Sequence, residues 1–151
     1  MRNLHEYHIS LTWKGSINIA KNYRYDKTYE LSFKNKPNLT GSADATFHGD
    51  KTLYNPEEML LSALASCYMM SFFYLCSQYQ IVIDSYIDNP VGKVKVNPNG
   101  SGQFEIVTLQ PVITTTHKDM LVVEELFSQA NDYCFIARSC NFIIKHNPTI
   151  N

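Results

Sequence analysis

The longest apolar stretch of the chain runs from Asn55 to Ile83 and carries no charged residue after Glu58. Its beginning is typical of a helix N-terminus, because Asn55 can cap the helix, Pro56 suits the first turn and Glu58 completes a capping box. Apolar residues lie on every side of the expected helix, which is typical of a helix that is buried all round. If it continues to Tyr79, the helix is about 36 Å long at ~1.5 Å per residue. The sequence therefore predicts one long buried helix near the middle of the chain.

Short segments with period-two alternation flank this helix, and turn residues bound them. Before the helix we expect strands at Tyr7–Trp13, Ser16–Tyr25 and Tyr29–Phe33, followed by a long loop, Lys34–Tyr54. After it we expect strands at Ile81–Asp88, Val91–Asn97 and Gln103–Thr116, a helix at Lys118–Tyr133 and a last strand at Asn141–His146. This order, three strands, helix, three strands, helix and strand, indicates an α+β fold. No linker or repeat divides the 151 residues, so we expect a single domain over residues 1–151.

Composition narrows the classes of partner. The net charge is −1 and the thirteen Lys and Arg residues are scattered, which argues against nucleic acid as the main partner. The apolar run is long enough to cross a membrane, but Ser, Tyr and Gln dilute it and acidic rather than basic residues flank it, so we expect no membrane. The N-terminus has no signal-peptide pattern. We therefore expect a cytoplasmic protein whose four cysteines are reduced thiols.

The four cysteines are the candidates for chemistry. Cys67 lies in the middle of the predicted helix, and Cys76 follows nine residues later, about 13 Å along the axis and on the opposite face, too far for a disulfide within one chain. Cys134 ends the second predicted helix and Cys140 precedes the last strand. No pair has Cys-x-x-Cys spacing, so no metal site is predicted. Any of the four can be a small buried hydrophobe, and we keep this interpretation for Cys76 and Cys140.

Two motifs carry a family resemblance. The run Asn55-Pro56-Glu57-Glu58 with Ala63-Leu64-Ala65-Ser66-Cys67, and the run Cys134-Phe135-Ile136-Ala137-Arg138-Ser139, resemble the two signatures of the OsmC/Ohr family, whose members reduce organic hydroperoxides. The resemblance extends over nearly the whole chain. It implies that Cys67 is the peroxidatic cysteine, that Cys134 is the resolving one, and that the fold is an intertwined homodimer with its active sites at the interface. It also implies an external dithiol reductant, such as a lipoylated protein, and no bound cofactor.

The chemistry needs a cation beside the reactive thiol. A free thiol with a pKa near ~8.5 is only a few per cent thiolate at neutral pH, and a helix dipole fades within about one turn of the helix end. Family members use an Arg that the first Glu of the Asn-Pro-Glu motif, here Glu57, positions. Glu57 lies about 15 Å from Cys67 along a straight helix, so a bridging Arg, a kink or the neighbouring subunit must close the gap. Of these we infer that two chains compose the site. Where relatives read Phe-Arg-Gly-Asp this chain has Phe47-His48-Gly49-Asp50, so the candidate cations are a protonated His48 and Arg24.

Less specific interpretations of the same residues remain open. Glu57 can be an ordinary first-turn carboxylate favoured by the helix dipole, and His48 an ordinary loop residue. The apolar side chains near Cys67 can accommodate an alkyl tail or simply form the core. The alternatives to a peroxidase are therefore a catalytically silent member of the family that binds a small apolar ligand, and a redox sensor that uses the same cysteine pair. Turnover with an organic hydroperoxide and a dithiol distinguishes the peroxidase from both.

Overall fold

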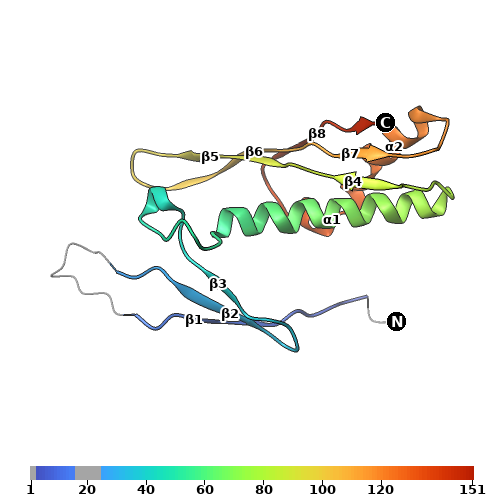
Figure 1. Cartoon of the computed structure of the whole chain (residues 1–151). Coiled ribbons are helices and arrows are strands. Elements are labelled where there is room, and N and C mark those ends of the chain that lie inside the picture. The colour runs from blue at the N-terminus through green and yellow to red at the C-terminus, as the bar shows by residue number, and fades with distance from the viewer. Residues whose placement is uncertain (1–2, 16–24) are drawn as a thin grey trace. The chain divides into compact units, whose positions relative to one another are not determined.

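A computed structural model describes residues 3–15 and 25–151 (Figure 1). The chain forms two compact units, Met1–Met59 and Leu60–Asn151. Most of the strand predicted at Ser16–Tyr25 lies outside the described residues, and so does Arg24.

The first unit contains an antiparallel sheet of three strands, β1 (Ile9–Thr12), β2 (Tyr29–Phe33) and β3 (Leu39–Gly41). Leu11, Leu31 and Leu39 are cross-strand partners, and Leu31 is buried. The alternation at β1 and β2 predicted both strands. The prediction of an unbroken loop from Lys34 to Tyr54 was wrong, because this segment holds β3 and the 3-10 helix η2 (Ala45–Phe47). Three residues are too few for a strand to show its period.

The long helix α1 (Pro56–Gln78) begins and ends on specific hydrogen bonds. The Glu58 backbone N–H donates to the Asn55 side chain over 2.8 Å, and the Asn55 N–H donates to the Glu58 carboxylate over 3.3 Å. This confirms the predicted capping box. At the other end Gln80 takes a left-handed φ of 56°, and the Ile81 N–H donates to the Cys76 carbonyl over 2.9 Å, which is a Schellman-type stop.

The second unit contains two more three-stranded sheets. Their orders are β4-β7-β9 and β5-β6-β8, where the strands are β4 (Ser85–Ile87), β5 (Val91–Val96), β6 (Gly102–Leu109), β7 (Val112–Thr114), β8 (Ile143–His146) and β9 (Thr149–Ile150). The single strand predicted at Gln103–Thr116 was wrong, because it breaks at Pro111 between β6 and β7. Pro90 and Pro148 lie at the equivalent breaks of the two neighbouring strands. A proline has no N–H to donate to the ladder, so each break falls where a ladder bond is lost.

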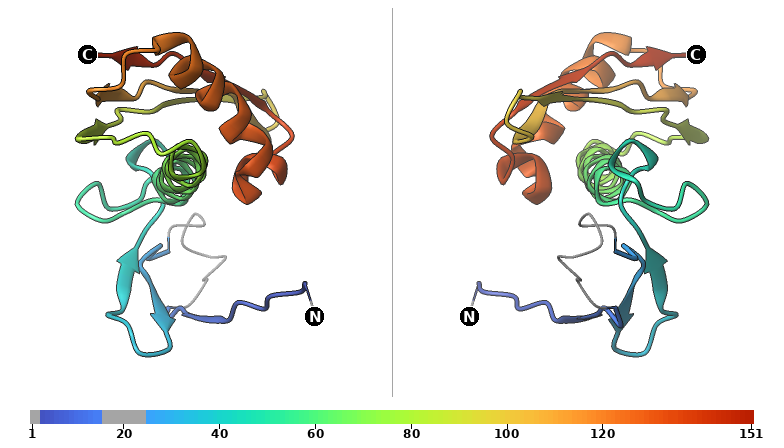
Figure 2. Two further views of the ribbon diagram at one scale, coloured as in Figure 1. Left: turned by 90° about the vertical axis from the view of Figure 1, so that its right-hand side faces the viewer. Right: turned by 90° about the vertical axis from the view of Figure 1, so that its left-hand side faces the viewer.

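The core of the second unit lies between these strands, α1 and the helix α2 (Met120–Tyr133), which the short helix α3 (Phe135–Arg138) follows. Both long helices lie on the same side of the strands, as Figure 2 shows with α1 seen end-on. The Phe72 ring of α1 stacks on the Phe127 ring of α2 with centroids 3.8 Å apart. The buried Tyr68 hydroxyl donates to the Phe127 carbonyl. This contact fixes α1 against α2 in the region where both candidate cysteines lie.

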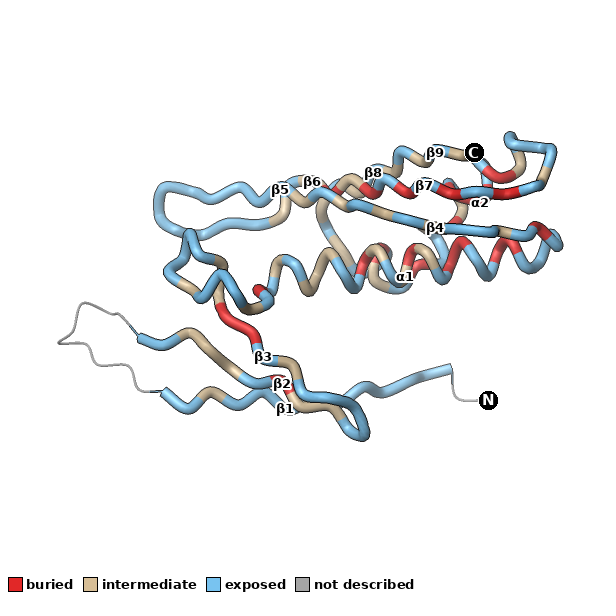
Figure 3. Tube along the Cα trace, viewed as in Figure 1, coloured by how far each residue is buried: buried red, intermediate tan, exposed pale blue. Residues whose placement is uncertain are grey.

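Helix α1 is buried along one stripe only. Its buried residues are Leu64, Tyr68, Ser71, Phe72, Leu75 and Cys76 (Figure 3). The opposite side is exposed in the single chain, at Met70 by 59% and at Tyr74 by 53%. The prediction of burial on every side is therefore not met within one chain. By length and composition α1 could also cross a membrane, but its buried stripe forms part of the core of the second unit.

Candidate active site

Cys67 lies at the start of the fourth turn of α1, beside the buried Tyr68. It is half-buried, and its side chain packs against the core cluster. Its backbone carbonyl accepts a hydrogen bond from the Ser71 hydroxyl over 2.9 Å. The thiol therefore lies at the edge of the core and keeps partial access to its surroundings.

Cys134 is completely buried at the junction of α2 and α3. Its N–H donates to the Ala130 carbonyl over 3.0 Å and closes α2, while its Sγ accepts from the Ala137 N–H over 3.3 Å and begins α3. Its thiol also lies close enough to the thiol of Cys67 for the two groups to interact. The two cysteines of the sequence motifs are thus in side-chain contact across the α1–α2 interface.

The environment of Cys134 favours the neutral thiol. Burial raises the pKa of Cys134 to about 12, and the side-chain contact with Cys67 raises it as well. The backbone N–H groups of Ala137 and Ile136 act in the opposite direction, but their effect is smaller. At neutral pH Cys134 is therefore protonated, and its S–H can donate to the Cys67 sulfur.

The other two cysteines have different surroundings. All four are free thiols. Cys76 is buried in the core of the second unit, and burial raises its pKa to about 11. Cys140 is half-buried, and burial raises its pKa too. Cys76 fills space in the core, as its interpretation as a small hydrophobe predicts.

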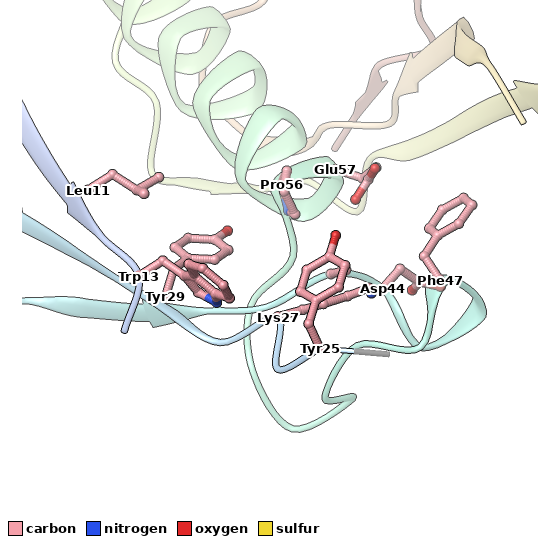
Figure 4. A pocket seen from close by; sticks show the side chains of 10 residues that line it. Leu11, Trp13, Tyr25, Lys27, Tyr29, Asp44, Phe47, Pro56 and Glu57 are labelled. Atoms are coloured by element: carbon pink, nitrogen blue, oxygen red, sulfur yellow. The ribbon is translucent and has the colours of Figure 1, made fainter. Parts of the chain in front are cut away.

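Glu57 lies in the first unit and lines a cavity of about 500 Å³ (Figure 4). The cavity is lined by Leu11, Trp13, Tyr25, Lys27, Tyr29, Ala43, Asp44, Phe47, Pro56 and Glu57. The Glu57 Oε2 atom is buried and has no hydrogen-bond partner among the described residues. Its charge acts on Tyr29, whose pKa is raised by burial first and by Glu57 second. Within the described residues, the carboxyl group thus lines the cavity with one buried oxygen that accepts no hydrogen bond.

Of the two predicted cations, the described part of the chain contains His48 alone, and His48 does not lie at this cavity. His48 is exposed at the end of η2, with a left-handed φ of 62°, and it does not line the cavity, although its neighbour Phe47 does. Arg24 lies outside the described residues. Among the described residues, the basic side chain that lines the cavity is Lys27, whose Nζ lies 3.8 Å from the centroid of the Tyr25 ring. No sequence motif marked Lys27, because its place follows from the tertiary contacts of the first unit.

A polar group inside the second unit was also missed by the sequence motifs. Tyr86, Asp88 and His146 each have a buried polar atom without a partner among the described residues. His146 lies against the Tyr68 ring with centroids 5.8 Å apart, and burial lowers its pKa. Burial likewise raises the pKa of Asp88. Both shifts favour the neutral forms of these side chains.

Comparison with known proteins places this arrangement in a family. Residues 48–150 match the family model described as OsmC-like protein. The chain belongs to the OsmC-like family. The match includes Glu57, Cys67 and Cys134 and leaves out Arg24 and Lys27. A search of curated proteins finds no match.

Solved structures of OsmC-like proteins share the fold. An OsmC-like protein of unknown function from Vibrio cholerae is 23% identical with a TM-score of 0.84, and the alignment covers 96% of this chain and 99% of that one. An organic hydroperoxide resistance protein from Elizabethkingia anophelis is 14% identical with a TM-score of 0.76 and full coverage, 100% of each chain. A third, described as an organic hydroperoxide resistance protein OsmC from Legionella pneumophila, is 12% identical with a TM-score of 0.73, and 98% of each chain is covered. These likenesses confirm the α+β fold of the family.

Proposed function

We propose that the protein is a thiol peroxidase that reduces organic hydroperoxides with Cys67 as the attacking thiol and Cys134 as the resolving thiol. The observation that carries the proposal is the side-chain contact between these two cysteines. The family also supports the proposal, because two of the structural relatives are described as organic hydroperoxide resistance proteins.

The reaction proceeds in three steps: attack on the peroxide, disulfide formation and reduction of the disulfide. The Cys67 thiolate attacks one oxygen of the O–O bond, so that the S–O bond forms, the O–O bond breaks, and the alkoxide leaves and takes up a proton as an alcohol. Cys134 then attacks the Cys67 sulfenic acid, which forms the disulfide and releases water. An external dithiol, such as a lipoyl group on a protein, reopens the disulfide by exchange and is itself oxidised. The contact between the cysteines means that resolution needs no large movement of α1 against α2.

The cation that stabilises the thiolate is Arg24 or a protonated His48, and Glu57 positions it. Substituting each residue separately distinguishes them. If His48 supplies the cation, His48→Arg raises the rate near neutral pH and removes the fall in rate with rising pH. An unchanged pH–rate profile in this variant, together with a large loss of rate in Arg24→Gln, assigns the role to Arg24.

The active form is a homodimer. Helix α1 exposes one apolar side in the single chain, and Glu57 lies ten residues before Cys67, about 15 Å along the helix. A site that contains both groups therefore draws one of them from a second copy. Sedimentation at micromolar concentration should show a dimer, and a monomer with full peroxidase activity would contradict this.

Three serine variants test the catalytic assignment. Cys67→Ser should lose turnover with cumene hydroperoxide and a dithiol, because a serine hydroxyl has essentially no anionic form at neutral pH. Cys134→Ser should consume about one equivalent and then stall or over-oxidise. Cys140→Ser is the matched control and should turn over normally, because Cys140 lies outside the contacting pair.

Intact-mass analysis and peptide mapping of the oxidised protein complete the test. The wild type should contain a Cys67–Cys134 disulfide. A disulfide through Cys140, or normal turnover in Cys67→Ser, would overturn the assignment. A silent ligand binder would show neither turnover nor a disulfide, and a redox sensor would form the disulfide without sustained turnover.

A further inference from the structure

Tyr68 follows Cys67 in α1 and is completely buried. Its hydroxyl donates a hydrogen bond to the Phe127 carbonyl of α2. Because a carbonyl oxygen has two lone pairs, that of Phe127 can accept this bond beside the one that it accepts within its own helix. The hydrogen bond therefore ties α2 to the residue next to the proposed attacking cysteine.

The part of α2 that Tyr68 contacts leads directly to Cys134. Phe127, Ala130 and Cys134 are all buried and follow one another at helical spacing, and the Cys134 N–H donates to the Ala130 carbonyl over 3.0 Å. Burial raises the pKa of Tyr68 most, and the charge of Cys134 is among those that raise it further. The Tyr68 hydroxyl therefore stays protonated, keeps its role as a donor, and lies near Cys134 as well as Cys67.

Two contacts with Phe127 join the helices, and they fix different things. The Phe72 ring stacks on the Phe127 ring with centroids 3.8 Å apart and planes 8° apart. Apolar contact of this kind has no preferred direction, so it resists separation of the rings more than sliding. A hydrogen bond weakens steeply when its length or angle changes. We therefore attribute the position of α2 along α1 mainly to the Tyr68 hydroxyl.

Formation of a disulfide depends on this position. The S–S bond is about 2.05 Å long, and the two Cα atoms that it joins must lie within about 7 Å of each other. A displacement of about 1 Å from the geometry of attack can lower a rate by a large factor. A Cys67 sulfenic acid that is not attacked by Cys134 meets a second hydroperoxide, which oxidises it to sulfinic acid and is itself reduced to the alcohol.

We propose that Tyr68 is a positioning residue for the resolving step, and that its hydrogen bond to α2 decides the fate of the Cys67 sulfenic acid. It holds the Cys134 sulfur at the sulfenic acid, so that disulfide formation is faster than over-oxidation. In this step the S–S bond forms, the S–O bond breaks, and the Cys134 proton leaves with the oxygen as water. The inference rests on the proposed function, which makes Cys67 and Cys134 the reacting pair.

Tyr68→Phe removes the hydroxyl and keeps the ring. The reduced protein is mixed with increasing concentrations of cumene hydroperoxide without a dithiol, and intact mass gives the ratio of disulfide to sulfinic acid. The concentration that over-oxidises half of the protein should be about threefold to tenfold lower in the variant, as expected for the loss of one hydrogen bond. The first equivalent should be consumed at the wild-type rate, because the Tyr68 hydroxyl does not act on the attack on the peroxide.

The redox equilibrium of the cysteine pair tests the same role without any peroxide. In glutathione buffers, the effective concentration of the Cys134 thiol toward Cys67 should also be about threefold to tenfold lower in Tyr68→Phe.

Two control variants separate positioning from a general loss of stability. Tyr86→Phe removes a hydroxyl whose buried oxygen has no hydrogen-bond partner among the described residues. Ile113→Val weakens the same core from β7, away from the two helices. Both variants should match the wild type in the ratio of disulfide to sulfinic acid and in the glutathione equilibrium.

The outcomes for Tyr68 and for the peroxidase are distinct. A wild-type protein that forms the Cys67–Cys134 disulfide in glutathione buffers but consumes no hydroperoxide would overturn the peroxidase, and the glutathione comparison would still decide the role of Tyr68. Equal values for the wild type and Tyr68→Phe in both measurements would overturn the positioning role alone. An equal change in Ile113→Val would overturn it too, because stability would then be the cause. A wild-type protein that forms no such disulfide in oxidised glutathione would overturn both proposals.

Discussion

The rate at which the disulfide forms should depend steeply on pH, because the resolving thiol is buried. With a pKa of about 12, only about one Cys134 in 10⁵ is a thiolate at pH 7, compared with about three in a hundred for an exposed cysteine of pKa near ~8.5. The more basic thiolate is intrinsically more nucleophilic, and with a Brønsted coefficient of ~0.45 this raises the rate constant of its attack by a factor of about 40. Resolution should therefore be roughly a hundredfold slower at pH 7 than resolution by an exposed thiol. It should accelerate about tenfold for each unit of pH between 7 and 9.

A single-turnover experiment measures this step apart from the attack on the peroxide. The reduced protein is mixed with one equivalent of cumene hydroperoxide at pH 6, where resolution is slowest, and then transferred to buffers between pH 7 and 9. Samples are quenched in acid, alkylated and analysed by intact mass, which separates sulfenic acid, disulfide and over-oxidised protein. With excess hydroperoxide the over-oxidised fraction should fall as pH rises, because faster resolution removes the sulfenic acid sooner.

The control for this experiment is Cys140→Ser, which should show the same slope because Cys140 lies outside the contacting pair. A rate of disulfide formation that stays constant between pH 7 and 9 would refute the reasoning. It would mean that Cys134 leaves its buried position before it reacts.

Three further predictions concern stability and can be measured by urea unfolding. Tyr68→Phe should lower the free energy of unfolding by about 1–2 kcal/mol, because the buried Tyr68 hydroxyl donates to the Phe127 carbonyl; an unchanged value would show that the bond contributes nothing net. Gln80→Gly should raise it by about 0.5–1 kcal/mol, because φ at this position is 56°; a loss would mean that the Gln80 side chain contributes more than the strain costs. Asn55→Ala should lower the free energy of unfolding by about 1 kcal/mol, because the Asn55 side chain accepts a hydrogen bond from the Glu58 N–H over 2.8 Å. Asn55→Asp should lower it much less, because Asp also caps helices; an equal loss in both variants would exclude the cap as the cause.

The parts of the fold that sequence could predict are those fixed by neighbouring residues. The start of α1 depends on Asn55, Pro56 and Glu58, which are adjacent in the chain, so the capping box was visible as a pattern. The end of α2 at Cys134 was also predicted within one residue. In both cases the signal and the structure lie within one turn of helix, so no distant contact was needed.

Distant pairing decides the elements that were missed. Strand β3 is only three residues long, and its partner is β2, as the pair Tyr29 and Gly41 shows. The break between β6 and β7 depends on Pro111, but apolar and polar residues alternate across it, so the pattern reads as one strand. Backbone hydrogen bonds continue past the break, from the Thr149 N–H to the Pro111 carbonyl over 2.8 Å. The local signal of this break is Pro111 itself, which has no N–H to donate to the ladder, and the alternation around it concealed that signal.

For the candidate site, sequence motifs indicated the residues and the structure supplied their environment. The motifs singled out Cys67, Cys134 and Glu57. Neither the burial of Cys134 nor the lack of a partner for one Glu57 oxygen within the described residues follows from any spacing. The cavity beside Glu57 needs Tyr25 and Phe47 to converge from segments that are far apart in the sequence. Convergence of this kind is a property of tertiary packing, which is why Lys27 was not predicted.

The sequence of α1 has no amphipathic pattern, because the polar residues on its exposed side are mainly serines whose hydroxyl groups bond to carbonyl groups of the same helix. The Ser66 hydroxyl donates to the Ser62 carbonyl over 2.7 Å and the Ser77 hydroxyl to the Tyr74 carbonyl over 2.6 Å. Because these donors are already used within the helix, covering its exposed side would leave them satisfied, whereas an unpaired buried hydroxyl would be costly. The apolar side chains on that side, such as Met70, would gain about 1.5–3 kcal/mol each on full burial. The chemistry of α1 is therefore that of a helix buried on all sides, and a second copy of the chain that presents the same face can complete this burial symmetrically.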